Sequence, residues 1–225
     1  MTTDLIETPS DLVAEAIDVE RVFGTNGSRV VAVQHATCRI ERGDRIALVG
    51  PSGSGKSTLL QILGALDQPT SGTVRWPSLG ARETLRPWKI SFVFQTESLL
   101  APLTVLENIE VPQLLGGSTA DDARRDASEI LNALDLGELA DKLPEEISGG
   151  QAQRAAVARS LITRPALILA DEPTGQLDHQ TAKHLLDLLL RRLKGSDAAL
   201  VIATHDPVVA ARMKTQWTMD HGVLR

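Results

Sequence analysis

A glycine-rich segment carries the most specific chemistry in the sequence: Gly50-Pro51-Ser52-Gly53-Ser54-Gly55-Lys56-Ser57-Thr58. Glycines in this pattern let backbone N–H groups converge on phosphate oxygens, and the helix that follows adds its positive N-terminal end. In such a loop the Lys56 ammonium reaches the β- and γ-phosphates, and the Ser57 hydroxyl ligates magnesium. A structural glycine turn is the alternative, but this segment follows an expected strand and opens an expected helix. We therefore predict that it binds ATP with Mg²⁺.

A second candidate is the carboxylate pair Asp171 and Glu172, which follows the apolar run Leu167–Ala170. Strand ends are where an open α/β sheet presents its ligand groups. Asp171 can hold magnesium through its water shell, and Glu172 can polarise an attacking water as a general base. Taken alone, such a pair could instead cap the next helix or stay solvated. The phosphate loop elsewhere in the chain favours the catalytic interpretation.

The elements that must position these groups alternate along the chain. Short apolar runs rich in β-branched residues are typical of strands buried on both faces of a parallel sheet: Arg45–Val49, Ile90–Phe94, Leu167–Ala170 and Leu200–Ala203. Other segments carry apolar residues at helical spacing: Ser57–Leu66, Ala120–Leu134, Gln151–Ile162 and Gln180–Leu193. This alternation predicts an α/β fold with crossover helices.

Outside this core, the sequence predicts an antiparallel hairpin from Ala16–Phe23 and Val30–Ile40, joined by the turn signal Gly24–Gly27. The strand pattern Gln216–Asp220, followed by a His221-Gly222 turn, indicates a second one. Leu99–Ser148 shows helical patterns and no strand. We expect one domain over residues 1–225, with an N-terminal tail over about 1–14 and a helical subdomain over about 96–158 inserted into the ATP-binding core.

Composition narrows the classes of function. The chain has 225 residues, 42% hydrophobic and 23% charged, which suffices for one substantial core. A formal charge of −6 disfavours nucleic acid as a partner. Cys38 is the single cysteine, so no internal disulfide forms, and a buried inert thiol is expected. No apolar stretch approaches the length of a membrane-spanning helix, and the start of the chain lacks the pattern of a secretory signal.

The segment Ile147-Ser148-Gly149-Gly150-Gln151, followed by Gln153-Arg154, resembles the signature of ABC ATPases, which separates them from other proteins with this phosphate loop. Small residues at a helix start would let Ser148 and the backbone at Gly149 and Gly150 approach a γ-phosphate. By chemistry alone, Ser-Gly-Gly fits a helix-capping loop better than a phosphate-binding turn. Its position between Lys56 and Asp171 supports the resemblance, which spans about Ala16 to Arg225 and implies the P-loop ABC ATPase fold.

The resemblance assigns roles to four further residues. Gln95 matches the glutamine that touches magnesium and the attacking water, and His205 matches the switch histidine. Asp178, in Gly175–Asp178, matches the loop that contacts the other subunit. The chain has no tyrosine, the residue on which this family most often stacks adenine, and Phe23 stands at the matching position. Packing under the hairpin is the alternative for Phe23.

Several segments are similar to the branch of lipoprotein-releasing and macrolide-exporter ATPases, which also contains a cell-division ATPase: Gly50–Leu66, Asp67–Gly72, Phe92–Gln95, Leu103–Ile109 and Pro173–Asp178. The chain departs from the branch at Ile147, where leucine is usual, and at Gln176, where asparagine is usual. The segment between Gly72 and Ile90 is shorter than in relatives. Thr96–Leu99, which in the family faces the membrane partner, lacks the aromatic residue that is often found there.

The resemblance implies that two subunits, identical or paralogous, close face to face on ATP. The phosphate loop of one chain and the Ser148–Gln151 turn of the other would then grip the nucleotide, while Glu172 and His205 align the water. It further implies a separate transmembrane permease or mechanotransmission subunit as the partner. The chain would then be cytoplasmic and peripheral on the inner face of the membrane. The alternative is a soluble ABC ATPase that acts in DNA repair or translation.

Overall fold

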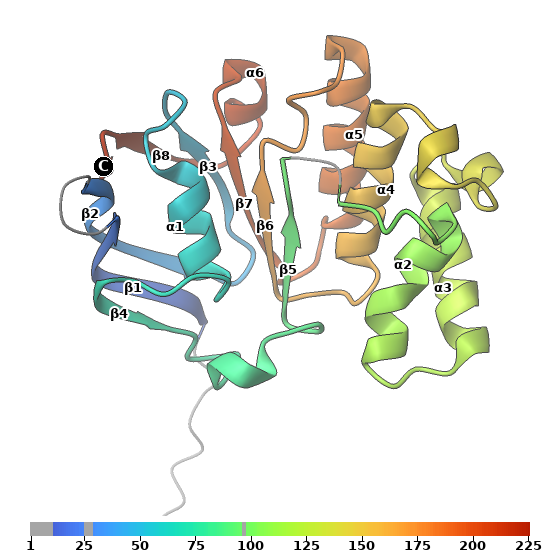
Figure 1. Cartoon of the computed structure of the whole chain (residues 1–225), viewed down its shortest axis with the longest axis horizontal. Helices are drawn as coiled ribbons and strands as arrows, with labels where there is room; N and C mark the ends of the chain where they lie inside the picture. Colours follow the sequence, from blue (N-terminus) through green and yellow to red (C-terminus); the bar gives the residue numbers. More distant parts are fainter. Residues whose placement is uncertain (1–10, 25–28, 96–97) are drawn as a thin grey trace, which may run out of the picture.

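The computed structural model describes residues 11–24, 29–95 and 98–225, and its strands form one mixed sheet flanked by helices (Figure 1). The strands are β1 (Leu12–Phe23), β2 (Val30–Glu41), β3 (Arg45–Val49), β4 (Ser71–Arg75), β5 (Ile90–Val93), β6 (Leu167–Asp171), β7 (Ala199–Thr204), β8 (Thr215–Asp220) and β9 (Val223–Leu224). The α-helices are α1 (Lys56–Leu63), α2 (Val105–Leu115), α3 (Ala120–Ala133), α4 (Gly149–Leu161), α5 (His179–Arg192) and α6 (Pro207–Ala210).

The sheet order is β4-β1-β2-β9-β8-β3-β7-β6-β5, and strands β8, β3, β7, β6 and β5 run parallel. The register sets Val49 beside Thr204 and Asp171 beside Ala203. The carboxyl ends of these strands therefore meet at one edge, the upper edge in Figure 1. The parallel core predicted from the four apolar runs is confirmed.

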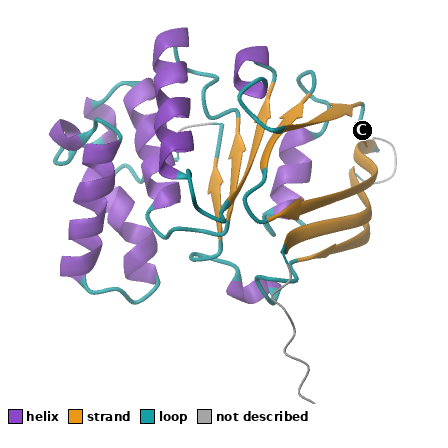
Figure 2. Ribbon diagram, turned by 180° about the vertical axis from the view of Figure 1, so that it is seen from behind, coloured by secondary structure: helices purple, strands orange, loops and turns teal. Residues whose placement is uncertain are grey.

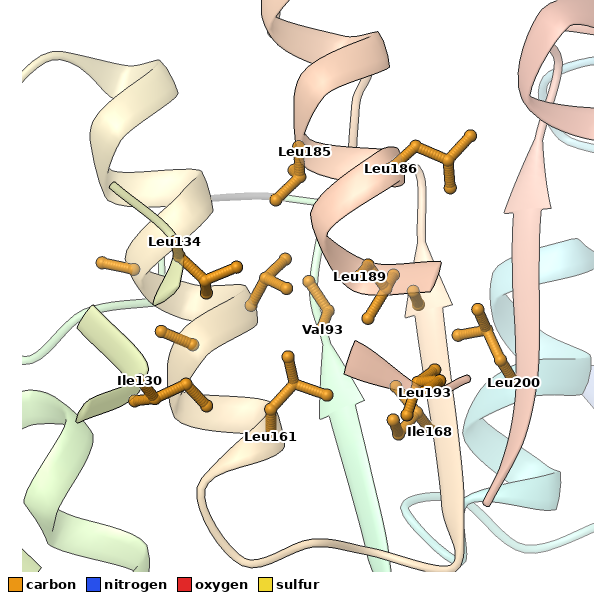
Figure 3. Packing of buried hydrophobic residues seen from close by; sticks show 14 of the residues in the cluster. Val93, Ile130, Leu134, Leu161, Ile168, Leu185, Leu186, Leu189, Leu193 and Leu200 are labelled. Carbon is orange, nitrogen blue, oxygen red and sulfur yellow. The ribbon is translucent and has the colours of Figure 1, made fainter. Parts of the chain in front are cut away.

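Alternate residues of each central strand face two separate hydrophobic cores. Leu167 and Leu169 of β6 pack with α1 and the β1–β2 hairpin, whereas Ile168 and Ala170 pack with α2, α3, α4 and α5. In Figure 3, Leu189 of α5 and Leu193, the residue that caps this helix, lie beside Val93 and Ile168 of the strands. Figure 2 shows α1 behind the sheet and α5 in front of it. Burial on both faces explains why these strands read as continuous apolar runs.

The antiparallel elements extend beyond what the sequence predicted. β1 and β2 form the expected hairpin, and β8 pairs antiparallel with β9, whereas the turn predicted at Gly24–Gly27 lies largely outside the described residues. The expected tail to residue 14 is too long, because β1 begins at Leu12 and Val13 is 1% exposed. Strand β4 was not predicted. Its residues are mostly exposed at the sheet edge, so they carry no hydrophobic pattern.

Between β5 and β6 the described residues form helices and no strand, as the sequence predicted. Two helices there begin at threonine caps: the Thr104 hydroxyl accepts from the Glu107 N–H, and the Thr119 hydroxyl accepts from the Asp122 N–H. Asn108 is fully buried, and its side chain bonds the backbone of Leu100, Leu103 and Thr104. This asparagine fastens the loop that leads into α2. Among the described residues, no helix has the length and apolar character to span a bilayer.

We predict that Leu189→Ala lowers the free energy of unfolding by about 2–5 kcal/mol, because the substitution leaves a cavity in the core between α5 and the sheet. Leu189 is 3% exposed. Denaturant titration measures the change, and Lys183→Ala, at an exposed position on the same helix, is the control with an expected change within about 0.5 kcal/mol. Equal losses for the two variants would contradict this account of the core.

Candidate functional site

The glycine-rich segment forms the loop between β3 and α1, at the carboxyl edge of the sheet (Figure 1). Gly53 and Gly55 adopt φ values of +77° and +104°, which side-chain-bearing residues rarely adopt. A Cβ at Gly55 would also collide with the Ala32 carbonyl of β2. The Lys56 ammonium, buried beneath the loop, donates to the Gly50 and Pro51 carbonyls at 2.9 Å each. The loop is therefore wrapped around the Lys56 side chain, which bonds two of its carbonyls.

The remaining loop residues divide into an exposed rim and a buried base. Pro51, Ser52 and Gly53 are exposed, whereas Ser54 is 3% exposed. The Ser54 hydroxyl oxygen is buried and has no hydrogen-bond partner among the described residues, and the Ser54 carbonyl accepts from the Gly222 N–H at 2.9 Å. Ser57 and Thr58 lie half-buried in the first turn of α1. The open rim leaves backbone donors accessible to an anion.

Asp171 ends β6 beside this loop, and its residue is 6% exposed. Burial raises the pKa of its carboxyl, while a hydrogen bond from Ser57 and the charge of Lys56 partly oppose the increase in pKa. Its Oδ1 atom is buried without a hydrogen-bond partner in the described part of the chain. A desolvated carboxylate with a free oxygen, next to a serine hydroxyl, is a donor set that suits Mg²⁺. The residues present therefore fit the metal that the sequence predicted.

Glu172 and His205 form a pair at the same edge. Glu172 is 8% exposed, and its Oε1 lies 2.9 Å from Nδ1 of His205, whose side chain is 62% exposed. The Glu172 backbone adopts φ +48°, a conformation that non-glycine residues rarely adopt and that clusters at functional sites. Its N–H donates to the Ala203 carbonyl of β7 at 2.9 Å. The fold thus holds the carboxylate in place against a neighbouring strand, with an exposed imidazole beside it.

Gln95 and Phe23 lie at strand ends. Gln95 is exposed just after β5, and residues 96–97 beyond it lie outside the described residues. Phe23 ends β1 and is 40% exposed. Its strand partner Val30 is two residues from Ala32, which touches the phosphate loop. Phe23 therefore lies at the end of the hairpin that adjoins the phosphate loop, and the residue is partly exposed.

The Ser-Gly-Gly turn opens α4. Ser148 is its N-cap, and a capping box links it to Gln151 through bonds of 2.8 Å and 3.3 Å. Ser148 is exposed, Gly149 and Gly150 are half-buried, and a Cβ at Gly150 would come within 3.0 Å of Leu177. The helix-cap interpretation is thus correct as a description of local structure. It does not compete with anion binding, because the helix start still points its free N–H groups outward.

Asp178 is likewise an N-cap, here of α5, and accepts from the N–H groups of Gln180 and Thr181 at 3.0 Å. Sequence reasoning gave no separate role to Gln153, which is 1% exposed in α4 and donates to the Phe94 carbonyl at 3.4 Å. This bond links α4 to the residue before Gln95. A polar residue on the buried face of a helix was the available signal.

The comparisons with known proteins agree with this geometry. The model of the family described as "ABC transporter" matches residues 33–175. The "lipoprotein-releasing system ATP-binding protein LolD" of Bordetella pertussis is 41% identical over 218 residues, which cover 94% of each chain. The protein of the same name from Legionella pneumophila (strain Paris) is 40% identical over 222 residues, covering 96% of this chain and 98% of the relative.

Solved structures give the same result. The dimeric post-hydrolysis structure of the ATP-binding cassette MJ0796 bound to ADP and Pi superposes with a TM-score of 0.86 at 33% identity, covering 94% of this chain and 96% of that one. The structure of cbiO1 from Clostridium perfringens, described as part of the ABC transporter complex cbiONQ, gives a TM-score of 0.80 at 25% identity, over 96% and 88% of the chains. The P-loop ABC ATPase fold expected from the sequence is confirmed.

The family model covers more than half of the chain, and the LolD relatives cover nearly all of it. The chain therefore belongs to the ABC transporter family, and it is an ATP-binding, ATP-hydrolysing subunit of that family.

Proposed function

We propose that this ATPase works in pairs on ATP with Mg²⁺ and drives a separate transmembrane permease. The observation that carries the proposal is the buried, unpartnered carboxylate oxygen of Asp171 beside the Lys56 loop, one residue before the Glu172–His205 pair. An isolated buried charge is costly unless a ligand compensates it. The LolD names of the relatives support a transporter role. Nothing observed favours the alternative role in DNA repair or translation.

Phosphate binding begins with Lys56. Its ammonium exchanges the carbonyls of Gly50 and Pro51 for oxygens of the β- and γ-phosphates, so its charge is already placed before nucleotide arrives. Backbone N–H groups from Ser52 to Thr58 surround the phosphates. Ser57 and Asp171 would hold Mg²⁺, together with Gln95 just beyond β5. Mg²⁺, when bound, offsets charge that develops on the transferred phosphoryl group.

Glu172 acts as the general base in this proposal. Its carboxylate accepts a hydrogen bond from the attacking water and takes the proton as the water oxygen bonds to phosphorus. His205 keeps that carboxylate oriented through its 2.9 Å contact, and its exposure allows it to follow the nucleotide as the site closes. The strained backbone of Glu172 fixes the carboxylate before substrate arrives, which lowers the reorganisation needed in the transition state.

A second copy or a paralogue completes the site. Ser148, Gly149 and Gly150 are accessible at the start of α4, and we assign them to the γ-phosphate bound by the opposite chain. Asp178 and its loop would contact that chain. The related cassette that is 33% identical forms a dimer with ADP and Pi, which supports this arrangement. The reaction then requires closure, which excludes water from the site.

The permease is proposed to dock on an apolar groove of about 380 Å³ beside β5 and α2. Phe92, Phe94, Pro112 and Leu115 line it, and Leu115 is 77% exposed. Phe94, which lines the groove, directly precedes Gln95, so we propose that nucleotide bound at Gln95 influences the partner at this groove. We propose that residues 96–158 move as a helical subdomain during closure, and that docking places the chain at the cytoplasmic face of the membrane.

We predict that Glu172→Gln lowers ATP turnover by about 10²–10⁴-fold, because the amide cannot accept the proton. It should retain nucleotide and accumulate as an ATP-held dimer. Turnover assays and gel filtration with ATP measure both effects, and Glu129→Gln on the exposed face of α3 is the control. Normal turnover without a dimer would remove Glu172 from the role of base.

We predict that Asp171→Asn stabilises the nucleotide-free protein by about 1 kcal/mol while weakening Mg²⁺-dependent ATP binding, since it removes a buried, uncompensated charge. Burial raises the folded-state pKa of Asp171, so its penalty is absent at acidic pH and grows as pH rises through the unfolded-state pKa. The stabilisation should therefore vanish in acid. Thermal melts in chelator across pH test this, with exposed Asp141→Asn as the control; a lower melting temperature at neutral pH would contradict it.

We predict that Leu115→Asp leaves basal ATP turnover within about two-fold but abolishes co-purification with detergent-extracted membrane protein, because a charge in the groove opposes apolar docking. Leu66→Asp, at a position 41% exposed beyond α1, controls for a new charge at an exposed apolar site. Retained co-purification by Leu115→Asp would place the docking surface elsewhere.

A further inference from the structure

The ring of Phe23 does not stand alone at the end of β1. The guanidinium carbon of Arg21 lies 4.4 Å from the ring centroid, within the range of a cation–π contact. Residues 21 and 23 of a strand share one face, so the contact follows from β1 itself. One face of the Phe23 ring is therefore covered by the Arg21 guanidinium, while the residue as a whole remains 40% exposed.

Arg21 is in turn fixed by Asp67. Two parallel bonds join them, Nε to Oδ2 at 2.8 Å and Nη2 to Oδ1 at 2.9 Å, with both side chains about a quarter exposed or less. This is the fork geometry in which arginine is most strongly oriented. Asp67 lies just beyond α1, and its Oδ1 also accepts from the Gln68 N–H at 2.7 Å. The guanidinium thus cannot leave the ring without breaking the fork.

The neighbouring backbone holds the same segment against β1. The Thr70 N–H donates to the Glu20 carbonyl at 2.8 Å, and the Val22 N–H donates to the Thr70 hydroxyl at 3.0 Å. Ser71 donates to the Glu20 carboxylate at 2.8 Å. Residues 67–71 therefore run along the strand that ends in Phe23, and they keep Asp67 in place below Arg21.

We propose that Arg21, held by Asp67, is a positioning residue for the nucleotide base. By stacking on one face of Phe23, it fixes the ring orientation and leaves the opposite face as the platform for adenine. This proposal rests on the proposed role of Phe23 in base binding. A platform that is already oriented loses less conformational entropy when the base stacks, which strengthens binding without new contacts to ATP.

The role is specific to the base, and this makes it testable. Arg21→Ala should weaken ATP binding by about two- to five-fold and raise KM by the same factor, with kcat unchanged. Binding of inorganic tripolyphosphate, which has no base to stack, should not change. Asp67→Asn, which keeps an acceptor for Gln68 but loses the charged fork, should shift ATP binding in the same direction. Calorimetry with Mg²⁺ gives each dissociation constant.

The matched control is Arg39→Ala, which removes an arginine ion-paired with Glu15 on the hairpin at a position away from the Phe23 ring. It should leave both ligands unaffected. In a Phe23→Ala background, Arg21→Ala should add no further loss of ATP affinity. Arg21→Lys, which keeps the charge without the planar fork, should behave like Arg21→Ala and serves if the alanine variant does not fold.

Distinct results separate the two hypotheses. If Phe23→Ala leaves ATP affinity unchanged, the base platform itself is wrong, and the role of Arg21 falls with it. If Phe23→Ala weakens ATP binding but Arg21→Ala and Asp67→Asn do not, only the role of Arg21 is overturned. It is also overturned if tripolyphosphate binding falls equally, which indicates a general structural role. Tighter ATP binding by Arg21→Ala would show that the guanidinium covers the face that the base requires.

Discussion

The site depends on one electrostatic constraint: the carboxylate of Asp171 ends a strand in which every residue is buried. Burial raises its pKa, and the Ser57 hydroxyl and Lys56 ammonium only partly compensate the charge. Because one carboxylate oxygen has no partner in the described residues, the nucleotide-free protein carries an uncompensated polar atom. A bound ligand can offset the cost of such a group, and its neighbours Lys56 and Ser57 are residues that we propose to bind phosphate and metal. The metal-dependent chemistry proposed above follows from this imbalance.

The parallel register of the strands brings other candidate residues close to Asp171. β6 lies between β5 and β7, so its end is surrounded by Gln95 on one side and by Thr204 and His205 on the other. The phosphate loop follows β3, the next strand beyond β7. Two hydrophobic cores, one on each face, hold these strands, and neither core contributes an ionisable group to the site. The residues that pack the cores and the residues of the candidate site thus lie in separate parts of the same strands. The well-packed strands can therefore tolerate backbone strain at their carboxyl ends, such as the positive φ of Glu172.

The sequence predicted the elements whose physical signal is local. The apolar runs of β3, β6 and β7 follow from burial of these strands on both faces. The glycine spacing of the loop follows from its backbone geometry. Each feature therefore determines residue types over a short stretch of sequence. Strand β4 escaped because its five residues lie at an edge and bury little. The start of β1 escaped because Val13 and Ala14 are buried by pairing with β2, a contact that is distant in sequence. Arg21 and Asp67 are 46 residues apart, so no local sequence pattern predicts their ion pair.

Helix α1 connects these local and distant features. Its first residue is Lys56, which we propose to bind the phosphates, and the segment just beyond its last residue supplies Asp67, which holds Arg21 on the ring of Phe23. The helix is packed through Leu59, Leu60 and Leu63, all fully buried, so its two ends cannot move independently. On the proposed assignments, α1 therefore joins the phosphate loop rigidly to the segment that holds Arg21 beside Phe23. The spacing between the proposed triphosphate and base subsites would then be set by this one helix.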